Sequence, residues 1–474
     1  MAVDGFASSD GSILTGSAAS GGLCDLIANS SGMTDRPSVI VVGGGLAGLV
    51  AARHLAAGGA DVTLVERRDR VGGRVATRER DGYRFDRGFQ VLFTAYPAVR
   101  RELDLDGLDL RRFAPGACLA RPSGRSTLAD PLREPRALPA TLRNTDVTVG
   151  DKLRVLRLRL ALGRTDFADI FEGPDGDIEA FLAKRGFSAR FRNRFAAPFL
   201  GGITLDRSLS TSARVFRYVY KALAEGHTAV PASGMGAIPA QLARGARRAG
   251  ATIETDTAVD RLEPAAETVD GAGGTGGVEL SIGGETRLAD AAVVATEPPT
   301  ARELTAVDAI PTDGRGCVTQ YYALPGGELD VGRRLVLNAD PPSERGEGEA
   351  WPNHVVPHSA VAPSYSPDDV ALVSATYLGV PNATDAALAE RSRRALESWF
   401  PARRFDGLER LHTDRIPFAQ FDQPPGIHDR LPDVRAPDGP VYLAGEYTRW
   451  SSIQGAMASG RDAAATLLAD LGSG

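Results

Sequence analysis

The sequence predicts an α/β fold in which a doubly wound, Rossmann-like domain is interleaved with an α+β domain. An apolar run at residues 39–42 leads into a glycine-rich turn, and an alanine-rich helical segment connects that turn to a second apolar run at 62–65. A third apolar run, at 441–443, precedes the last helical segment. Strands that alternate with helices form parallel sheets covered by helices. A chain of 474 residues also exceeds the size of one compact core, which indicates two intertwined domains.

The turn after the first predicted strand has the spacing of a dinucleotide-binding fingerprint. Gly43 permits the tight turn, Gly45 lets the backbone approach a pyrophosphate, and Gly48 lets the following helix pack closely on the sheet. The phosphates then bind free N–H groups at the helix N-terminus. A glycine-rich turn alone would be weak evidence, but here strand, fingerprint, helix and second strand follow in order.

Glu66 ends the second predicted strand, about 20 residues after the fingerprint, where dinucleotide-binding domains carry an acidic residue. Its carboxylate can accept hydrogen bonds from both hydroxyls of an adenosine ribose. The same charge would repel a 2′-phosphate, so the sequence disfavours NADP.

The segment after Glu66 distinguishes FAD from NAD. It begins at Arg67 and places Gly72 and Gly73 directly before Arg74. This pattern resembles the glycine-pair-plus-arginine signature of flavoproteins in the amine oxidase and phytoene desaturase superfamily. The resemblance implies that these residues continue the cofactor site towards the flavin, and the predicted cofactor is FAD. The alternative is an ordinary polar turn.

The C-terminal region supplies an independent match. The apolar run there leads to Gly445 and Glu446, and Ile453 and Gln454 open the final predicted helix. By the same resemblance, Glu446 binds the ribityl or phosphate part of FAD, and N–H groups near Ile453 and Gln454 face the pyrimidine edge of the flavin. The positive end of a helix would stabilise negative charge at that edge.

Four further segments are similar to phytoene desaturases of the plant and cyanobacterial type or to their superfamily. They are residues 85–97, 231–239, 290–296 and 416–426. The first departs from the family at Asp86, where glutamate is expected, and at Gln90, where histidine is expected. The resemblance implies additional cofactor contacts at Leu46, Ala47, Arg67, Gly88, Phe89, Val259 and Ala456.

The order of these motifs predicts a discontinuous cofactor domain. Residues 33–90, 230–300 and 435–474 are expected to form the Rossmann-like FAD-binding domain. Residues 91–229 and 301–434 are expected to form the α+β substrate domain.

Apolar spacing predicts several elements of the substrate domain, namely helices at 181–199 and 211–224 and strands at 317–323 and 372–377. Residues 151–164 predict a basic amphipathic helix of a kind that can lie on anionic lipid. We favour a solvated helix covering the substrate domain. The alternative is a peripheral contact with the inner face of a membrane.

Residues 1–32 are rich in Gly, Ser and Ala and fit neither a secretory signal nor a transit peptide. Met33 is a plausible start, so we expect residues 1–32 to be disordered or not translated. Gly-rich residues 271–277 predict a flexible hairpin tip, and residues 343–349 predict a mobile loop.

The composition is that of a globular protein, with 43% hydrophobic and 24% charged residues. A net charge of −6 and a pI near 5.7 give no reason to expect nucleic acid binding. The cysteines Cys24, Cys118 and Cys317 are too few and scattered for a disulfide framework or a zinc site. The strand-like Val-Val-Pro between His354 and His358 does not put them on one helical face, so we predict no metal. The cysteine usage predicts a reduced, cytoplasmic location.

These features predict an FAD-dependent oxidoreductase that removes hydride from a hydrophobic substrate of the isoprenoid or carotenoid type. Such a substrate must be held close to the flavin in a dry pocket. Phe89, Gln90 and Tyr321 are candidates for the pocket wall because they lie beside family motifs. The sequence identifies neither a catalytic residue nor the electron acceptor.

Two more enzyme activities and a non-catalytic role stay open. Flavin amine oxidases usually carry a lysine in the substrate domain, but no lysine follows Lys221, and Cys317 stands about where it is expected. Ser452 also stands where an aromatic residue would flank an amine. A third activity is that of a flavin-dependent polyene isomerase, which would use reduced flavin without net oxidation. A flavoprotein that serves only as a scaffold is a further alternative, but the intact Glu66, Gly72, Gly73, Arg74 and Glu446 favour a functional site.

Overall fold

The computed structural model describes residues 36–122, 124–130, 133–265, 277–339 and 350–472. The predictions for residues 1–32, for 343–349 and for all of 271–277 except Gly277 therefore lie outside the described residues. Among the described residues, no helix is both long and apolar enough to cross a membrane.

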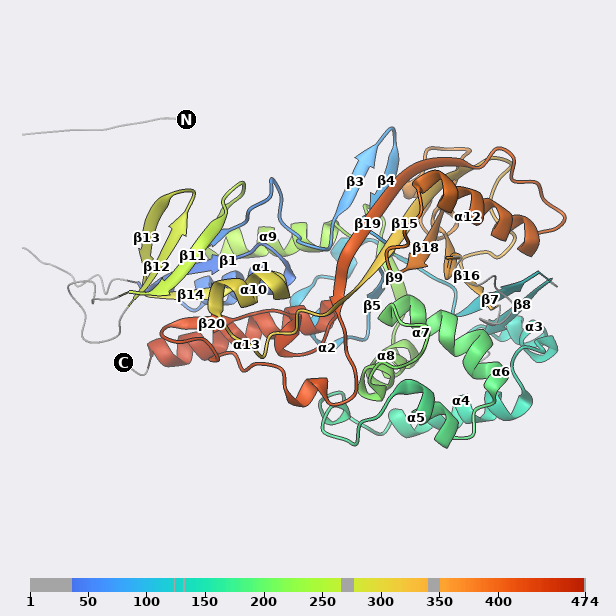
Figure 1. Cartoon of the computed structure of the whole chain (residues 1–474), viewed down its shortest axis with the longest axis horizontal. Coiled ribbons are helices and arrows are strands. Elements are labelled where there is room, and N and C mark those ends of the chain that lie inside the picture. Colours follow the sequence, from blue (N-terminus) through green and yellow to red (C-terminus); the bar gives the residue numbers. More distant parts are fainter. Residues whose placement is uncertain (1–35, 123, 131–132, 266–276, 340–349, 473–474) are drawn as a thin grey trace, which may run out of the picture. The chain divides into compact units, whose positions relative to one another are not determined.

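A five-stranded parallel sheet forms around the glycine-rich turn (Figure 1). Its order is β10 (Thr252–Glu254), β2 (Asp61–Val65), β1 (Ser38–Val42), β14 (Ala291–Val294) and β20 (Val441–Leu443). The predicted strands at 39–42, 62–65 and 441–443 are confirmed. The five strands of the sheet come from three distant parts of the chain, at 38–65, 252–294 and 441–443.

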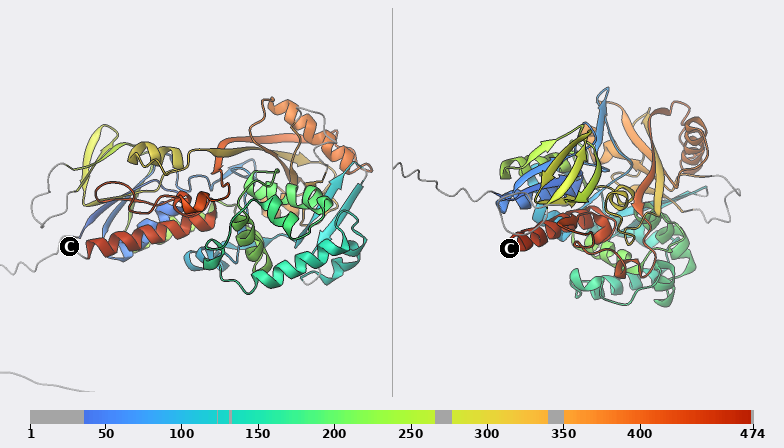
Figure 2. Two further views of the ribbon diagram at one scale, coloured as in Figure 1. Left: turned by 60° about the horizontal axis from the view of Figure 1, so that its bottom comes forward. Right: turned by 60° about the vertical axis from the view of Figure 1, so that its left-hand side comes forward.

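Strand β1 is buried on both faces because each face of the sheet is covered. Val39 and Val41 pack in the cluster that includes the covering helices, whereas Ile40 and Val42 pack in a second cluster on the other face. The helices are α1 (Leu46–Ala57), α9 (Ala237–Ala249) and α13 (Ile453–Leu471), and α13 lies along α1 (Figure 2). The second face is covered by β11 (Val259–Pro264), β12 (Val278–Ile282) and β13 (Glu285–Ala289), with α10 (Pro298–Thr305).

A second, larger sheet has seven strands and contains both parallel and antiparallel pairs. Its order is β19 (Glu409–Phe421), β15 (Gly314–Leu324), β18 (Ala371–Leu378), β17 (His354–Pro357), β16 (Leu335–Asn338), β7 (Gly116–Arg121) and β8 (Gly124–Ala129). Only the β16–β7 pair is parallel. The predicted strands at 317–323 and 372–377 are confirmed as parts of β15 and β18.

Helices cover both faces of this sheet. Ala117 and Leu119 of β7 pack on one face in the cluster formed by helices between residues 149 and 220. Cys118 and Ala120 point to the other face, which packs against α12 (Asp385–Trp399). The helices that cover the face of Ala117 and Leu119 are α4 (Val149–Leu162), α5 (Ile178–Lys184), α6 (Ala189–Phe191), the π-helix η4 (Arg192–Ala196), α7 (Ala197–Thr204) and α8 (Ala213–Glu225).

The predicted continuous helix at 181–199 is wrong, because two residues interrupt it. Gly186 has a φ of 78°, a left-handed conformation that ends α5. The Ser188 side chain then caps a new helix by accepting a hydrogen bond from the Phe191 N–H at 3.1 Å. The helix predicted at 211–224 is confirmed as α8, and that at 151–164 as α4.

The remaining α-helices and β-strands lie outside these sheets. They are β3 (Thr77–Arg80), β4 (Tyr83–Asp86), β5 (Leu92–Phe93), α2 (Pro97–Glu102), β6 (Leu110–Arg112), α3 (Leu138–Arg143), β9 (Thr228–Pro231) and α11 (His358–Val361). The chain from Pro37 onwards forms one compact unit. The division into a cofactor domain and a substrate domain therefore stays a prediction.

Candidate cofactor and substrate cavity

A single cavity of about 1040 Å³ brings the glycine-rich turn and the C-terminal motif together. All the predicted cofactor residues line it except Gly48 and Gln454. The lining members are Gly43, Gly45, Leu46, Ala47, Glu66, Arg67, Gly72, Gly73, Arg74, Gly88, Phe89, Val259, Gly445, Glu446, Ile453 and Ala456.

Gly48 and Gln454 lie behind the cavity wall and hold it in place. A Cβ at Gly48 would lie 2.0 Å from the carbonyl oxygen of Gly43, so only glycine lets α1 pack this closely on the turn. The Gln454 side-chain oxygen accepts a hydrogen bond from the Ala98 N–H at 2.8 Å. This bond ties the start of α13 to α2.

The turn between β1 and α1 leaves room for a ligand beside its backbone. Gly43 has a φ of 108°, and its N–H donates to the Val65 carbonyl at 2.8 Å. A Cβ at Gly43 would lie 2.8 Å from the Ala295 carbonyl oxygen, whereas a Cβ at Gly45 would meet no atom within 4 Å. Gly45 thus borders open space at the N-terminus of α1, which is the geometry that a pyrophosphate requires.

Glu66 presents a fixed carboxylate to the same end of the cavity. The residue is only 6% exposed, and its side chain accepts hydrogen bonds from the Gly44 N–H at 2.8 Å and the Arg68 N–H at 3.0 Å. Both donors are backbone groups, so the carboxylate cannot swing away from a ligand. A negative charge held here suits ribose hydroxyls and opposes a 2′-phosphate.

Arg74 and Glu446 join the two halves of the cofactor motif. Their side chains form an ion pair, and Arg74 Nη1 also donates to the Ala419 carbonyl at 3.0 Å. The nearby helix α13 begins at Ile453, and its cap Ser452 accepts a hydrogen bond from the Gly455 N–H at 2.8 Å. The positive end of α13 therefore borders the cavity.

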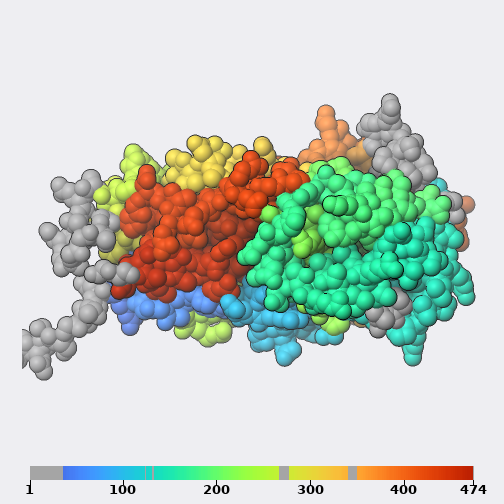
Figure 3. Space-filling model, turned by 90° about the horizontal axis from the view of Figure 1, so that it is seen from below, coloured from blue at the N-terminus to red at the C-terminus, as the bar shows by residue number. Residues whose placement is uncertain are grey.

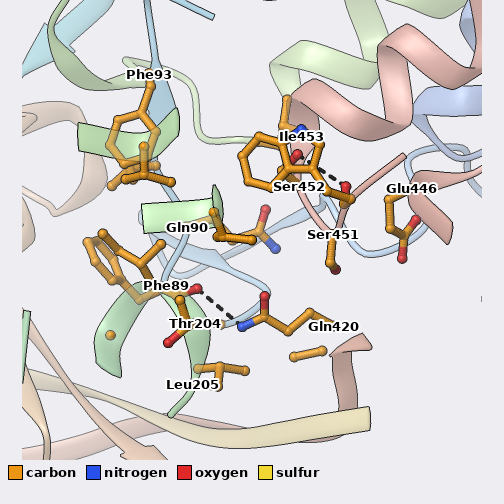
Figure 4. Close-up of a pocket in the computed structure, with 18 of the residues that line it drawn as sticks. Phe89, Gln90, Phe93, Thr204, Leu205, Gln420, Glu446, Ser451, Ser452 and Ile453 are labelled. Carbon is orange, nitrogen blue, oxygen red and sulfur yellow. Dashed lines mark hydrogen bonds between the residues drawn. The ribbon is translucent and has the colours of Figure 1, made fainter. Parts of the chain in front are cut away.

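The candidate substrate residues Phe89 and Gln90 line the middle of the cavity. Figure 4 shows Gln90 between Phe89 and Phe93 on one side and Ser452 and Ile453 on the other. The Gln90 Nε2 donates to the carbonyls of Arg74 and Arg87 at 2.8 and 3.0 Å. These bonds fix the amide.

Tyr321 does not line the cavity. It is fully buried, and its hydroxyl donates to the Asp86 carbonyl at 2.8 Å. Tyr321 shares a face of β15 with Cys317, which does line the cavity, but it lies four residues further, or about 13 Å, along the strand. Tyr321 packs against Phe85 of β4, and its hydroxyl lies 3.4 Å from the carbonyl oxygen of the lining residue Gly88, so Tyr321 lies behind the cavity wall.

Sequence reasoning missed the aromatic wall of the substrate side. Phe187, Phe191, Phe195 and Phe199 all line the cavity, and their successive ring centroids are 4.6, 5.3 and 5.3 Å apart. The π-helix η4 lies within this aromatic ladder, and π-helical turns often occur at functional sites. The repeat of Phe at every fourth position from 187 to 199 was the available signal.

Burial disfavours the charged forms of two titratable groups that line the cavity, His354 and Cys317. The pKa of His354, which packs 5.2 Å from the Phe89 ring, falls to about 4 because burial disfavours its charged form. Burial raises the pKa of the Cys317 thiol to about 12. In the described residues, no group of three or more His, Cys, Asp or Glu side chains is placed to hold a metal ion.

Residues 46–468 match the model of the family described as flavin-containing amine oxidoreductases. The chain is 32% identical over 261 residues to a phytoene dehydrogenase of Streptomyces griseus, covering 49% of this chain and 50% of that protein. It is 33% identical over 178 residues to a coproporphyrinogen III oxidase of Propionibacterium freudenreichii subsp. freudenreichii, covering 35% of this chain and 31% of that protein. The matches thus span half or less of these relatives' lengths.

A solved structure of cyclohexylamine oxidase from Brevibacterium oxydans IH-35A shares the fold. The TM-score is 0.64 at 18% identity, and the match covers 92% of this chain and 100% of that one. The open turn at Gly45, the fixed carboxylate of Glu66 and the helix end at Ile453 fit FAD. The chain belongs to the flavin-containing amine oxidoreductase family.

Proposed function

We propose that this enzyme removes hydride from an extended apolar substrate of the isoprenoid or carotenoid type. The observation that carries the proposal is the aromatic ladder along the cavity. A flat conjugated chain can stack or make edge contacts along such a row of rings. The similarity over half of its length to a phytoene dehydrogenase supports the same substrate class.

The cofactor-binding residues act by position. Glu66 would accept hydrogen bonds from the adenosine ribose, and the backbone at Gly45 would border the pyrophosphate. Arg74 holds Glu446, which would face the ribityl side, and the positive end of α13 at Ile453 would stabilise negative charge at the flavin. Bound FAD supplies the hydride acceptor.

The substrate side of the cavity excludes water and orients the reacting carbon. Burial keeps His354 and Cys317 neutral, so neither of these two side chains brings a charge to the cavity wall near Phe89. Gln90 is held by two backbone carbonyls, so its amide oxygen can accept a hydrogen bond from a bound molecule without rearrangement. Positioning in a dry site lowers the barrier to hydride transfer.

The cavity offers less to an amine. Cys317 is a neutral thiol on β15, and Lys152 is the one lysine among the lining residues. Lys152 lies on α4 and donates to the Asn144 carbonyl at 3.2 Å. Amine oxidases of this superfamily usually place their lysine on a strand of the substrate domain, whereas Lys152 lies on a helix and the strand residue Cys317 is not a lysine.

Anaerobic mixing of the FAD-loaded enzyme with candidate substrates tests the proposal. We expect an isoprenoid polyene to bleach the flavin absorbance and to gain a double bond. Rapid bleaching by an amine, with no response to polyenes, would contradict the proposal. A rearranged polyene without bleaching would indicate isomerisation instead.

Substitution within the ladder gives a second readout of the same proposal. We expect Phe195→Ala to slow polyene-dependent bleaching roughly 2- to 10-fold, because one aromatic contact is worth about 0.5–1.5 kcal/mol. Phe181→Ala is the matched control, since Phe181 packs on Phe216 and does not line the cavity. Equal slowing in both variants would assign the effect to packing rather than to substrate contact.

A further inference from the structure

Exposed apolar side chains gather on two consecutive helices. Among the described residues, every exposed large hydrophobic side chain except Leu288 and Val380 belongs to α3 or α4. These side chains are Leu138, Leu142, Val149, Leu153, Leu156 and Leu160, and their exposed fractions run from 41% to 71%. A cluster of this kind marks a surface that contacts another phase or molecule.

Helix α4 is apolar on two faces, although packing requires only one. Leu158 and Leu162 point into the core. Val149, Leu153, Leu156 and Leu160 recur at intervals of four, three and four residues, which places them in one exposed stripe along the helix.

The helix that carries this stripe is held firmly. Thr148 and Asp151 form a capping box, with the Asp151 N–H donating to Thr148 Oγ1 at 3.1 Å. The buried Asp151 carboxylate also accepts a hydrogen bond from the Ser188 N–H at 2.8 Å, which links α4 to α6. The exposed stripe is therefore part of a fixed helix rather than a frayed end.

The charge around the stripe is positive, although the whole chain has a net charge of −6. The exposed basic residues of this region, none of which forms an ion pair with a described residue, are Arg136, Arg143, Arg157 and Arg164. Of the acidic side chains between Arg136 and Asp166, Asp146 and Asp151 are buried and bonded inwards, and Asp166 is exposed, which leaves the exposed charge of this segment positive. Leucines interspersed with unpaired arginines complement an anionic lipid surface.

The stripe is continuous with the substrate side of the cavity. Leu156 is 42% exposed and also lines the cavity, together with its α4 neighbours Lys152, Val155 and Arg159. Figure 3 shows this part of the chain in teal on the face viewed from below. A substrate dissolved in a bilayer would have a path past Leu156 into the cavity.

We propose that α3 and α4 dock the enzyme on an anionic membrane surface so that the apolar substrate enters beside Leu156. The entry of substrate beside Leu156 rests on the proposed function, because a membrane would supply the enzyme only with an apolar substrate. The docking itself can be measured without any turnover, so the two proposals can fail separately.

Flotation of the FAD-loaded protein with lipid vesicles tests the docking. We expect it to float with vesicles of phosphatidylcholine and phosphatidylglycerol at low salt and to float less as salt screens the arginines. Leu153→Asp with Leu160→Asp should lower the vesicle-bound to free ratio by about tenfold or more, because two apolar side chains no longer enter the lipid. Retained flavin absorbance shows that the variant is folded.

The matched control places the same two substitutions on the exposed apolar residues outside the stripe. Leu288→Asp with Val380→Asp should leave flotation unchanged. Equal loss in both double variants, or no flotation of the unmodified protein, overturns the proposal. A dimer in sedimentation that Leu153→Asp with Leu160→Asp dissociates would identify the stripe as an interface between copies and also overturns it.

Discussion

At Gly45 the backbone is open to the cavity, and its conformation is one that any residue can adopt. Its φ of −72° and ψ of −179° are extended, and an added Cβ would meet no atom within 4 Å. At Gly43, two residues earlier, an added Cβ would collide with Ala295. A side chain added at Gly45 therefore tests whether the ligand requires this space, without disturbing the packing of the protein itself.

We expect Gly45→Ala to weaken FAD binding by about 1–3 kcal/mol, because the methyl group occupies space that a phosphate approaches. Titration of the FAD-free protein by flavin fluorescence measures the change. Gly176→Ala is the matched control, since a Cβ there also meets no atom within 4 Å and Gly176 does not line the cavity. Unchanged affinity in Gly45→Ala would place the pyrophosphate elsewhere.

Single residues differ in how far their positions follow from the sequence. The glycines and Glu66 lie within one strand–turn–helix–strand unit, so local spacing determines where they meet. Tyr321 lies on a long strand whose pairing with β19 shifts register between Tyr321 and Tyr322. Its depth depends on that distant partner, which no local pattern reveals, and the expected place in the pocket wall was wrong.

The buried histidines of β17 and α11 make stability depend on pH. Burial lowers the pKa of His354 to about 4, and burial with the nearby His354 lowers that of His358 to about 3, from an ordinary value of 6.5. Below pH 6.5 the unfolded chain binds protons that the folded chain does not. The free energy of unfolding therefore falls as pH falls from 6.5 towards 4.

We expect His358→Gln to reduce the loss of stability between pH 7.5 and pH 5.0 by about 2 kcal/mol, because each such histidine contributes about 1.4 kcal/mol per pH unit below 6.5. Chemical denaturation at the two pH values measures this difference. Ser374→Ala is the control, since it removes the hydrogen bond to His358 Nε2 at 2.8 Å and keeps the titrating ring. If both variants keep the full pH dependence, His358 is not the responsible group.

At the scale of elements, the sequence predicts isolated strands and helices better than their interruptions. The apolar spacing across 181–199 is continuous, yet Gly186 and Ser188 divide it into separate helices. Phe191, Phe195 and Phe199 lie on the second helical stretch and Phe187 lies just before it. All four rings belong to or pack on a buried cluster and also line the cavity, and apolar spacing alone does not distinguish a cavity wall from a packed core.

FAD binding should stabilise the protein as one unit, because its predicted site joins residues that lie far apart in the chain. The turn at Gly45 and the ion pair between Arg74 and Glu446 border the same cavity. The parallel sheet is likewise built from strands between residues 38 and 443. The sequence predicts this convergence only through motif order, whereas the parallel pairing of β16 with β7 has no sequence signal.

We therefore expect FAD to raise the midpoint of a single thermal unfolding transition in the FAD-free protein. A ligand at 100 times its Kd adds about 2.7 kcal/mol to the free energy of unfolding. NADP at the same concentration should leave the midpoint unchanged, because Glu66 holds a negative charge where the 2′-phosphate would lie. Scanning calorimetry measures both shifts.

Two separate transitions, of which FAD moves only one, would show that the two sheets unfold independently. An equal shift with NADP would show that Glu66 does not select the nucleotide.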